Sequence, residues 1–161
     1  MNFKIIASKR KLSDISFNVL STTPELASEI GTFIDEIYED SFKKAISEGS
    51  EFPVFIEHKN FQHAALARNK SGKIISCLTM KPYENPNEFY ISLLTHPDYQ
   101  NMKLSSVLVI KAIQLAKGNK QEIFKLKASV NNGSYSEKIF TKLGFNTSNP
   151  KSSKVVYELD F

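Results

Sequence analysis

The sequence predicts an α/β (α+β) fold with a mixed, mostly antiparallel central sheet flanked by helices. Three observations lead to this expectation. Apolar residues recur at helical spacing over residues 26–46, apolar runs separated by short turns follow over 64–95, and two helical segments alternate with strand-like segments after residue 103. A run of strands followed by an alternation of helices and strands is typical of a helix-flanked mixed sheet.

The first half of this pattern begins with residues 1–16, which alternate apolar and basic groups and are expected to form a short strand or an arm. Residues 17–21 read as a strand. The tetrapeptide 22–25 predicts a helix start, because Pro24 is tolerated in the first turn. The helix should carry an apolar stripe made of Leu26, Ile30, Phe33, Ile34, Ile37, Tyr38, Phe42 and Ile46. Residues 47–50 should end this helical region after a break.

Three strands are expected next. Residues 64–68 and 73–80 are apolar runs around the Gly-containing turn 69–72, which is a hairpin pattern. A second turn over 82–87 leads into a strand at 88–95. Consecutive strands joined by short turns pair side by side, so these three should form an antiparallel meander.

The second half alternates helix and strand. Residues 104–117 form an apolar-rich helical run that stops at Gly118-Asn119, a favourable C-terminal cap. Residues 123–130 alternate as a strand, and 134–143 predict a short helix. Residues 155–159 complete the pattern as a last strand.

Length and composition bound the class of protein. The chain has 161 residues, 41% of them hydrophobic and 24% charged, which predicts one globular domain over residues 1–161. No apolar run approaches the roughly 20 residues that span a bilayer, so no membrane partner is expected. The single cysteine, Cys77, excludes an internal disulfide framework and favours a cytoplasmic location. It lies in an apolar strand, where a small buried hydrophobe is the more frequent role than a nucleophile.

The net charge of +4 is distributed unevenly. Residues 1–99 carry 11 basic and 13 acidic groups, whereas residues 100–161 carry 10 and 4. Nucleic acid, including charged transfer RNA, would be one partner for the basic half. All basic residues after Arg68 are lysines, which disfavours bidentate readout and argues against nucleic acid. A solvated basic face explains the same charges.

The most informative stretch runs from His96 to Leu108, between the expected strand 88–95 and the helix from Leu104. A strand, a short polar loop and a helix in this order direct the first N–H groups of the helix toward one point. Those unpaired donors and the positive end of the helix dipole favour an anion there.

Two motifs in this half resemble those of the GCN5-related N-acetyltransferase (GNAT) family. Residues 100–105, Gln-Asn-Met-Lys-Leu-Ser, stand where the family has Gln/Arg-x-x-Gly-x-Gly/Ala, and Leu143-Gly144-Phe145 closes the following helix. The resemblance covers about residues 17–161, and its specific part is 88–145. It implies a GNAT-like fold, acetyl-CoA as the coenzyme and an amine as the acceptor.

The resemblance also implies a set of cofactor-binding positions. They are Leu93, Leu94, Thr95, Gln100, Asn101, Met102, Lys103, Leu104, Ser105, Ser106, Asn131, Asn132 and Phe140. Lys103 replaces the first glycine of the motif, and residues 73–117 contain no glycine. The loop is therefore expected to use right-handed dihedrals, with the charge of Lys103 near the phosphates. The alternative is that Ser105 or Ser106 caps a helix that binds no ligand.

Five of these positions concern the pantetheine arm. In the family this arm pairs with the strand before the loop, here through the backbone of residues 93–95, as in strand addition. Asn131 and Asn132 match the region of an asparagine that faces the arm. A turn role for Asn-Asn-Gly fits those two residues equally well.

The catalytic candidates are few. The family often uses a tyrosine as general acid five residues before the phenylalanine of Leu-Gly-Phe, and this chain has Phe140 there. Tyr135 is the substitute acid, although five residues of helix turn it by about 140° away from that position. Glu88 is the candidate base, acting through water. His96 precedes a proline, which favours a structural role.

The remaining expectations concern the acceptor and the partners. Acidic residues gather over 36–51, in the region that lines the acceptor groove in related proteins, and would favour a cationic amine; a solvated helix face explains them as well. His58 and His63 lack metal-ligand spacing, so no metal is expected. The resemblance thus implies an N-acetyltransferase acting on an amine of a small molecule or protein. The alternative is a catalytically weak coenzyme-binding module, and a homodimer stays open.

Overall fold

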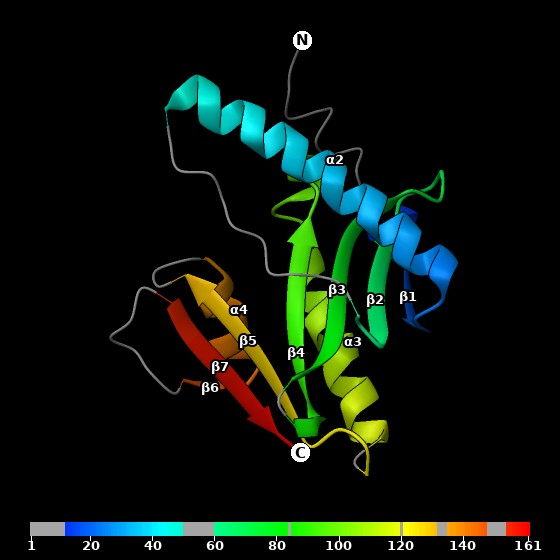
Figure 1. Cartoon of the computed structure of the whole chain (residues 1–161), viewed down its shortest axis with the longest axis vertical. Coiled ribbons are helices and arrows are strands. Elements are labelled where there is room, and N and C mark those ends of the chain that lie inside the picture. Colours follow the sequence, from blue (N-terminus) through cyan, green and yellow to red (C-terminus); the bar gives the residue numbers. More distant parts are fainter. Residues whose placement is uncertain (1–11, 50–59, 84, 120, 132–134, 148–153) are drawn as a thin grey trace.

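A seven-stranded mixed sheet in the order β1-β2-β3-β4-β5-β7-β6 forms the centre of the protein (Figure 1). The computed structural model describes residues 12–49, 60–83, 85–119, 121–131, 135–147 and 154–161. The strands are β1 Ser16–Ser21, β2 His63–Arg68, β3 Ile74–Tyr83, β4 Asn85–Thr95, β5 Lys125–Asn131, β6 Asn146–Thr147 and β7 Lys154–Asp160. The helices are the 3-10 turns η1 Leu12–Asp14 and η2 Pro97–Tyr99, and the α-helices α2 Pro24–Glu48, α3 Leu104–Gly118 and α4 Tyr135–Lys142.

The pairing of the strands confirms the expected fold class. Strands β1 to β4 are antiparallel neighbours, so the predicted meander is present and β1 extends it. The connection through α3 makes β5 parallel to β4, and β7 then pairs with β5 antiparallel. The turn expected over 82–87 is shorter, because β3 continues to Tyr83 and β4 resumes at Asn85. The two-residue strand β6 was not expected, since two residues leave no periodic signal.

Helices cover the two faces of the sheet. Helix α2 lies across one face, over β1 to β3, and α3 lies on the opposite face (Figure 1). The larger core cluster joins α3 and α4 to the sheet and includes the fully buried Leu108, Leu126 and Phe140. The smaller cluster joins the buried stripe of α2 to β2 and β3. None of the helices in the described ranges has both the length and the apolar character needed to cross a bilayer.

Helix α2 begins as its sequence predicts. Thr23 accepts a hydrogen bond from the backbone N–H of Leu26 at 3.1 Å, and Pro24 occupies the first helical position, where no N–H is needed. The expected break was wrong, because the helix runs without interruption to Glu48. Gly49 follows it with a φ of 64°, the left-handed conformation that commonly ends a helix.

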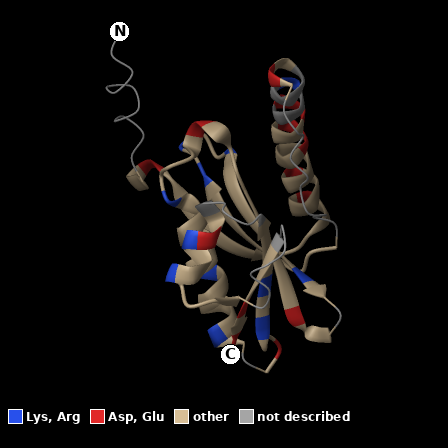
Figure 2. Ribbon diagram, turned by 90° about the vertical axis from the view of Figure 1, so that its left-hand side faces the viewer, with Lys and Arg blue, Asp and Glu red and all other residues tan. Residues whose placement is uncertain are grey.

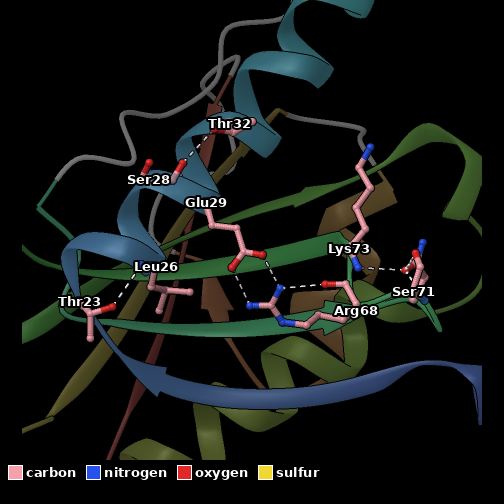
Figure 3. A network of polar contacts seen from close by, with 10 residues as sticks. Thr23, Leu26, Ser28, Glu29, Thr32, Arg68, Ser71 and Lys73 are labelled. Carbon is pink, nitrogen blue, oxygen red and sulfur yellow. Dashed lines mark hydrogen bonds and ion pairs between the residues drawn. The ribbon is translucent and has the colours of Figure 1, made fainter.

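An ion pair ties α2 to the β2–β3 hairpin. The guanidinium of Arg68 donates through Nη2 to Oε1 of Glu29 at 2.8 Å and through Nη1 to Oε2 of the same carboxylate. Nη1 also donates to the carbonyl of Gly72 at 3.0 Å, in the hairpin turn (Figure 3). The hydrogen bonds from Arg68 lower the pKa of Glu29 below its usual value.

We expect Glu29→Gln to lower the free energy of unfolding at pH 7 by about 0.5–1 kcal/mol, since solvent screens this partly exposed pair. The lowered pKa of Glu29 means that the pair stabilises the fold above the pKa of the unfolded carboxyl. This stabilisation disappears as pH falls through the folded pKa. The difference between wild type and variant in urea unfolding should therefore be smaller at about pH 3 than at pH 7.

The matched control is Glu36→Gln, which removes a more exposed pair. Glu36 lies 3.3 Å from the ammonium of Lys73, and both side chains are about half exposed. An effect of Glu36→Gln as large as that of Glu29→Gln would show that the Arg68 geometry adds nothing.

Candidate active site

A cleft with a volume of about 370 Å³ lies where the end of β4, the loop before α3 and the helix α4 meet. Residues 93–95, 99–101 and 103–106 supply most of its wall, and α4 supplies the rest. Its lining residues are Leu93, Leu94, Thr95, Tyr99, Gln100, Asn101, Lys103, Leu104, Ser105, Ser106, Ser136 and Ile139. Nine of the thirteen predicted cofactor positions are among them, so the structure brings these positions together.

The start of α3 presents backbone donors to this cleft. Lys103 is the N-cap residue and its side chain makes no capping hydrogen bond. The first intrahelical bond of this turn is from the N–H of Val107 to the carbonyl of Lys103, at 3.2 Å. The N–H groups of residues 104–106 therefore have no acceptor within the helix. Together with the helix dipole they favour an anion at this point of the cleft.

The loop before α3 corrects one expectation about its backbone. Lys103 was expected to use right-handed dihedrals, but it adopts φ 61° and ψ 23°, the left-handed region. Asn101 is also left-handed, with φ 68°. The motif position that the family fills with glycine thus keeps a glycine-like conformation without a glycine. A lysine Cβ pays a steric cost there that glycine avoids.

We expect Lys103→Gly to raise the free energy of unfolding by about 0.5–1 kcal/mol. The substitution relieves the strain of the left-handed backbone, and the greater entropy of glycine in the unfolded chain offsets part of this gain. For a chain of this size the melting temperature should rise by about 1–4 °C. Asn101→Gly is the matched control, and it should gain less, because asparagine tolerates the left-handed region. A loss of stability in Lys103→Gly would show that the lysine side chain stabilises the loop.

Strands β4 and β5 separate on the way to the cleft. They pair only through three positions, from Glu88 with Lys125 to Tyr90 with Lys127. Beyond this paired segment β4 and β5 diverge, as Figure 1 shows. Leu93, Leu94 and Thr95 line the cleft on this side. An extended, amide-containing ligand could therefore pair with β4 as an added strand would.

The histidine before the loop has a structural role. His96 accepts a hydrogen bond at Nδ1 from the backbone N–H of Asp98, at 3.1 Å, and caps η2. The backbone N–H of His96 donates to the carbonyl of Ile75 at 2.8 Å. Its ring also lies edge-on to Tyr99, with ring centroids 6.0 Å apart. These contacts hold the turn that leads from β4 into the loop.

Phe140, a predicted cofactor-binding position, lies in the core and is not among the residues that line the cleft. Its side chain is 1% exposed and packs against the rings of Phe145 and Tyr157, with centroid distances of 5.0 Å and 5.7 Å. Helix α4 turns Ser136 and Ile139 toward the cleft instead. These two residues are one helical turn apart, and that spacing is the signal by which they could have been found.

Glu88 lies in an ion-pair network rather than at the cleft. Its carboxylate is 3.2 Å from the ammonium of Lys127 and 3.9 Å from that of Lys125. Lys127 lowers the pKa of this carboxyl, which makes it a weaker base. Five residues separate Glu88 from Leu93, the first lining residue on the strand, or about 16 Å of extended chain.

The remaining predicted positions, Met102, Asn131, Asn132 and Tyr135, are not among the described residues that line the cleft. Met102 is partly buried against the larger core and is not a lining residue among those described. Asn131 ends β5 and pairs in register with Lys154, whereas Asn132 lies outside the described residues. Tyr135 begins α4, but its side chain is also outside the described part. Tyr99, which lines the cleft, was missed as a site residue because its role depends on the turn before it.

The single cysteine is not a nucleophile. Cys77 is 2% exposed in β3, and burial raises the pKa of its thiol to about 12. The thiolate, which is the reactive form, is therefore scarce at neutral pH. Within the described ranges, no group of three or more His, Cys, Asp and Glu side chains could hold a metal ion.

Comparisons with known proteins agree with this geometry. A profile of the "Acetyltransferase (GNAT) family" matches residues 32–145. The GNAT domain of PAT from S. lividans superposes with a TM-score of 0.63 at 15% identity, over 94% of this chain and 99% of that one. A GNAT-family acetyltransferase from Streptococcus pneumoniae gives 0.62 at 15% identity, over 89% and 97%.

A third structure, yncA from Salmonella typhimurium, was solved with its cofactor acetyl-CoA. It superposes with a TM-score of 0.61 at 10% identity, over 89% of this chain and 93% of that one. At these identities the structures show a shared fold. No curated protein matches the chain at a significant level.

Proposed function

Because the chain belongs to the acetyltransferase (GNAT) family, whose function is acetyl transfer from acetyl-CoA, we propose that it acetylates an amine of a small molecule or protein. The observation that carries this proposal is the cleft at the end of β4, with the uncapped start of α3 in its wall. The sheet includes every described strand, which supports one acyl-CoA-binding domain over residues 1–161.

The residues of the cleft suit the parts of acetyl-CoA. The N–H groups of residues 104–106 would bind the diphosphate, and the ammonium of Lys103 would add a positive charge. The backbone of residues 93–95 would pair with the amides of the pantetheine arm. When bound, acetyl-CoA supplies an activated acyl group as a thioester. The protein then has to orient the amine and exclude water.

The candidates for the general acid and the general base follow from where Phe140, Tyr135 and Glu88 lie in the fold. Position 140 has no proton to give, and its ring is committed to the core. Tyr135 is the candidate acid, since it carries a phenol at the start of α4. Glu88 is the candidate base only through intervening water, because its carboxylate is held by Lys127. We therefore assign most of the catalysis to positioning and to backbone donors.

The acceptor side carries an acidic helix. Red segments recur along the long helix α2 in Figure 2 (Figure 2). Part of that charge is already neutralised, since Glu36 pairs with Lys73 and Glu39 with Lys43. The remaining acidic groups would favour a cationic amine, which is the acceptor class proposed here.

A second function is a module that binds the coenzyme without efficient catalysis. The observation in its favour is Phe140, which stands where the family often has a tyrosine acid. Both functions require acetyl-CoA to bind, and they differ only in turnover.

The experiment that tests the proposal measures binding and turnover together. Acetyl-CoA should raise the melting temperature, and its consumption should exceed background with at least one member of a panel of primary amines. Binding without turnover on that panel would favour the module. If acetyl-CoA causes no thermal shift in the folded protein, both functions are wrong.

A further inference from the structure

Three hydroxyl groups form a chain from the interior of the sheet to the wall of the cleft. Ser76 Oγ, on β3, lies 2.7 Å from Thr95 Oγ1, at the end of β4. Thr95 Oγ1 lies 3.1 Å from Ser105 Oγ, in the first turn of α3. Ser76 Oγ also lies within hydrogen-bonding distance of the carbonyl of Leu94, at 3.3 Å. The chain thus links three elements that meet at the cleft.

The two ends of this chain are in different environments. Ser76 is 0% exposed and is one of two buried polar side chains among the described residues, the other being Thr79. Thr95 and Ser105 both line the cleft, whereas Ser76 does not. The buried hydroxyl therefore contacts two lining residues, Thr95 through its hydroxyl and Leu94 through its carbonyl.

Each hydroxyl has a single proton, so the chain can run in two directions. In one, Ser105 donates to Thr95, Thr95 to Ser76 and Ser76 to the carbonyl of Leu94. In the other, Ser76 donates to Thr95 and Thr95 to Ser105, which frees the proton of Ser105 for an acceptor in the cleft. Changing from the first direction to the second breaks only the 3.3 Å hydrogen bond from Ser76 to Leu94. The Ser76–Thr95 and Thr95–Ser105 hydrogen bonds are present in both directions.

We propose that Ser76 and Thr95 are positioning residues that orient the hydroxyl of Ser105 as a donor to an anionic oxygen in the cleft. This inference rests on the proposed function, in which that oxygen belongs to the diphosphate of acetyl-CoA. A hydroxyl that accepts a hydrogen bond becomes a better donor, so the chain strengthens the bond that Ser105 makes. The bond to a charged oxygen is also stronger than one to a neutral acceptor.

The test is a double-mutant cycle on affinity, measured by titration calorimetry with CoA. Ser105→Ala should weaken binding about tenfold, the usual loss for a hydrogen bond to a charged group. Ser76→Ala should weaken it about two- to fivefold in the wild-type background, because the first donor of the chain is lost. In the Ser105→Ala background the same Ser76→Ala change should have no effect, since the hydroxyl it orients is gone.

Two controls separate orientation from a general structural role. Thr79→Val removes the other buried hydroxyl of β3, which by strand alternation faces the opposite side of the sheet, and it should leave CoA affinity unchanged. S-acetylpantetheine lacks the diphosphate, so its affinity should not respond to Ser76→Ala. In steady state Ser76→Ala should raise KM for acetyl-CoA and leave kcat unaltered.

The inference is overturned if the Ser76 and Ser105 effects are additive, or if Ser76→Ala changes S-acetylpantetheine binding as much as CoA binding. An unchanged affinity in Ser76→Ala would overturn it too. These results are distinct from failure of the proposed function, in which wild-type protein binds neither CoA nor acetyl-CoA and both proposals fall together.

Discussion

Replacing Lys103 by glutamate is expected to weaken acetyl-CoA binding about tenfold to thirtyfold at physiological salt, because an attraction to the diphosphate becomes a repulsion. Lys103 lines the cleft at the N-cap of α3, beside the N–H groups proposed to bind the phosphates. Glutamate has a Cβ like lysine, so the left-handed backbone is strained in both proteins. Calorimetric titration with acetyl-CoA measures the change, and the loss should shrink as salt is added.

Lys117→Glu is the matched control for this charge reversal. Lys117 is exposed in the last turn of the same helix, about 20 Å from Lys103 at 1.5 Å per residue. That separation exceeds the screening length of about 8 Å in physiological salt, so binding should change little. Equal losses in the two variants would mean that the basic half acts through its overall charge and not through a phosphate site at Lys103.

Phe140→Ala is expected to lower the free energy of unfolding by about 3–5 kcal/mol, the usual cost of removing a buried aromatic ring. Phe140 is among the largest fully buried side chains and packs on Phe145 and Tyr157. For a chain of this length the melting temperature should fall by about 6–20 °C. Thermal unfolding followed by circular dichroism measures this shift.

Two other substitutions test whether the loss of stability comes from the buried position of Phe140. Phe124→Ala removes a ring that is 48% exposed and should cost much less. Phe140→Tyr should also destabilise, by about 1–3 kcal/mol, because a hydroxyl is buried without an arranged partner. If Phe140→Tyr keeps full stability and gains turnover, the hydroxyl has reached the cleft, and the core assignment of this position is wrong.

Most of the fold could be predicted from the sequence because it depends on periodic burial. The stripe of α2, from Leu26 to Ile37, is spaced as an amphipathic helix requires, and the structure buries it against β2 and β3. The Gly-containing turn 69–72 indicated the hairpin, and Gly118 indicated the end of α3, because glycine is common in turns and at helix ends. The two-residue strand β6 has no such signal, because it exists only through its pairing with β7.

Residues of the candidate site could be predicted where their position follows from the order of strand, loop and helix. They could not be predicted where the position depends on backbone dihedrals or on which face of a helix packs inward. A strand followed by a loop and a helix places residues 93–95 beside 103–106 in any such unit, and these residues do line the cleft. The left-handed conformation of Lys103 was missed because the sequence shows only that glycine is absent. The burial of Phe140 was not foreseen, because a resemblance to a motif does not reveal which face of α4 packs inward.

A crystal structure of the protein with CoA bound is the most direct test of the proposed phosphate site. We expect diphosphate oxygens within hydrogen-bonding distance of the backbone nitrogens of residues 104–106, and pantetheine amides paired with residues 93–95. A CoA molecule bound elsewhere on the protein, with the start of α3 making no phosphate contact, would contradict it.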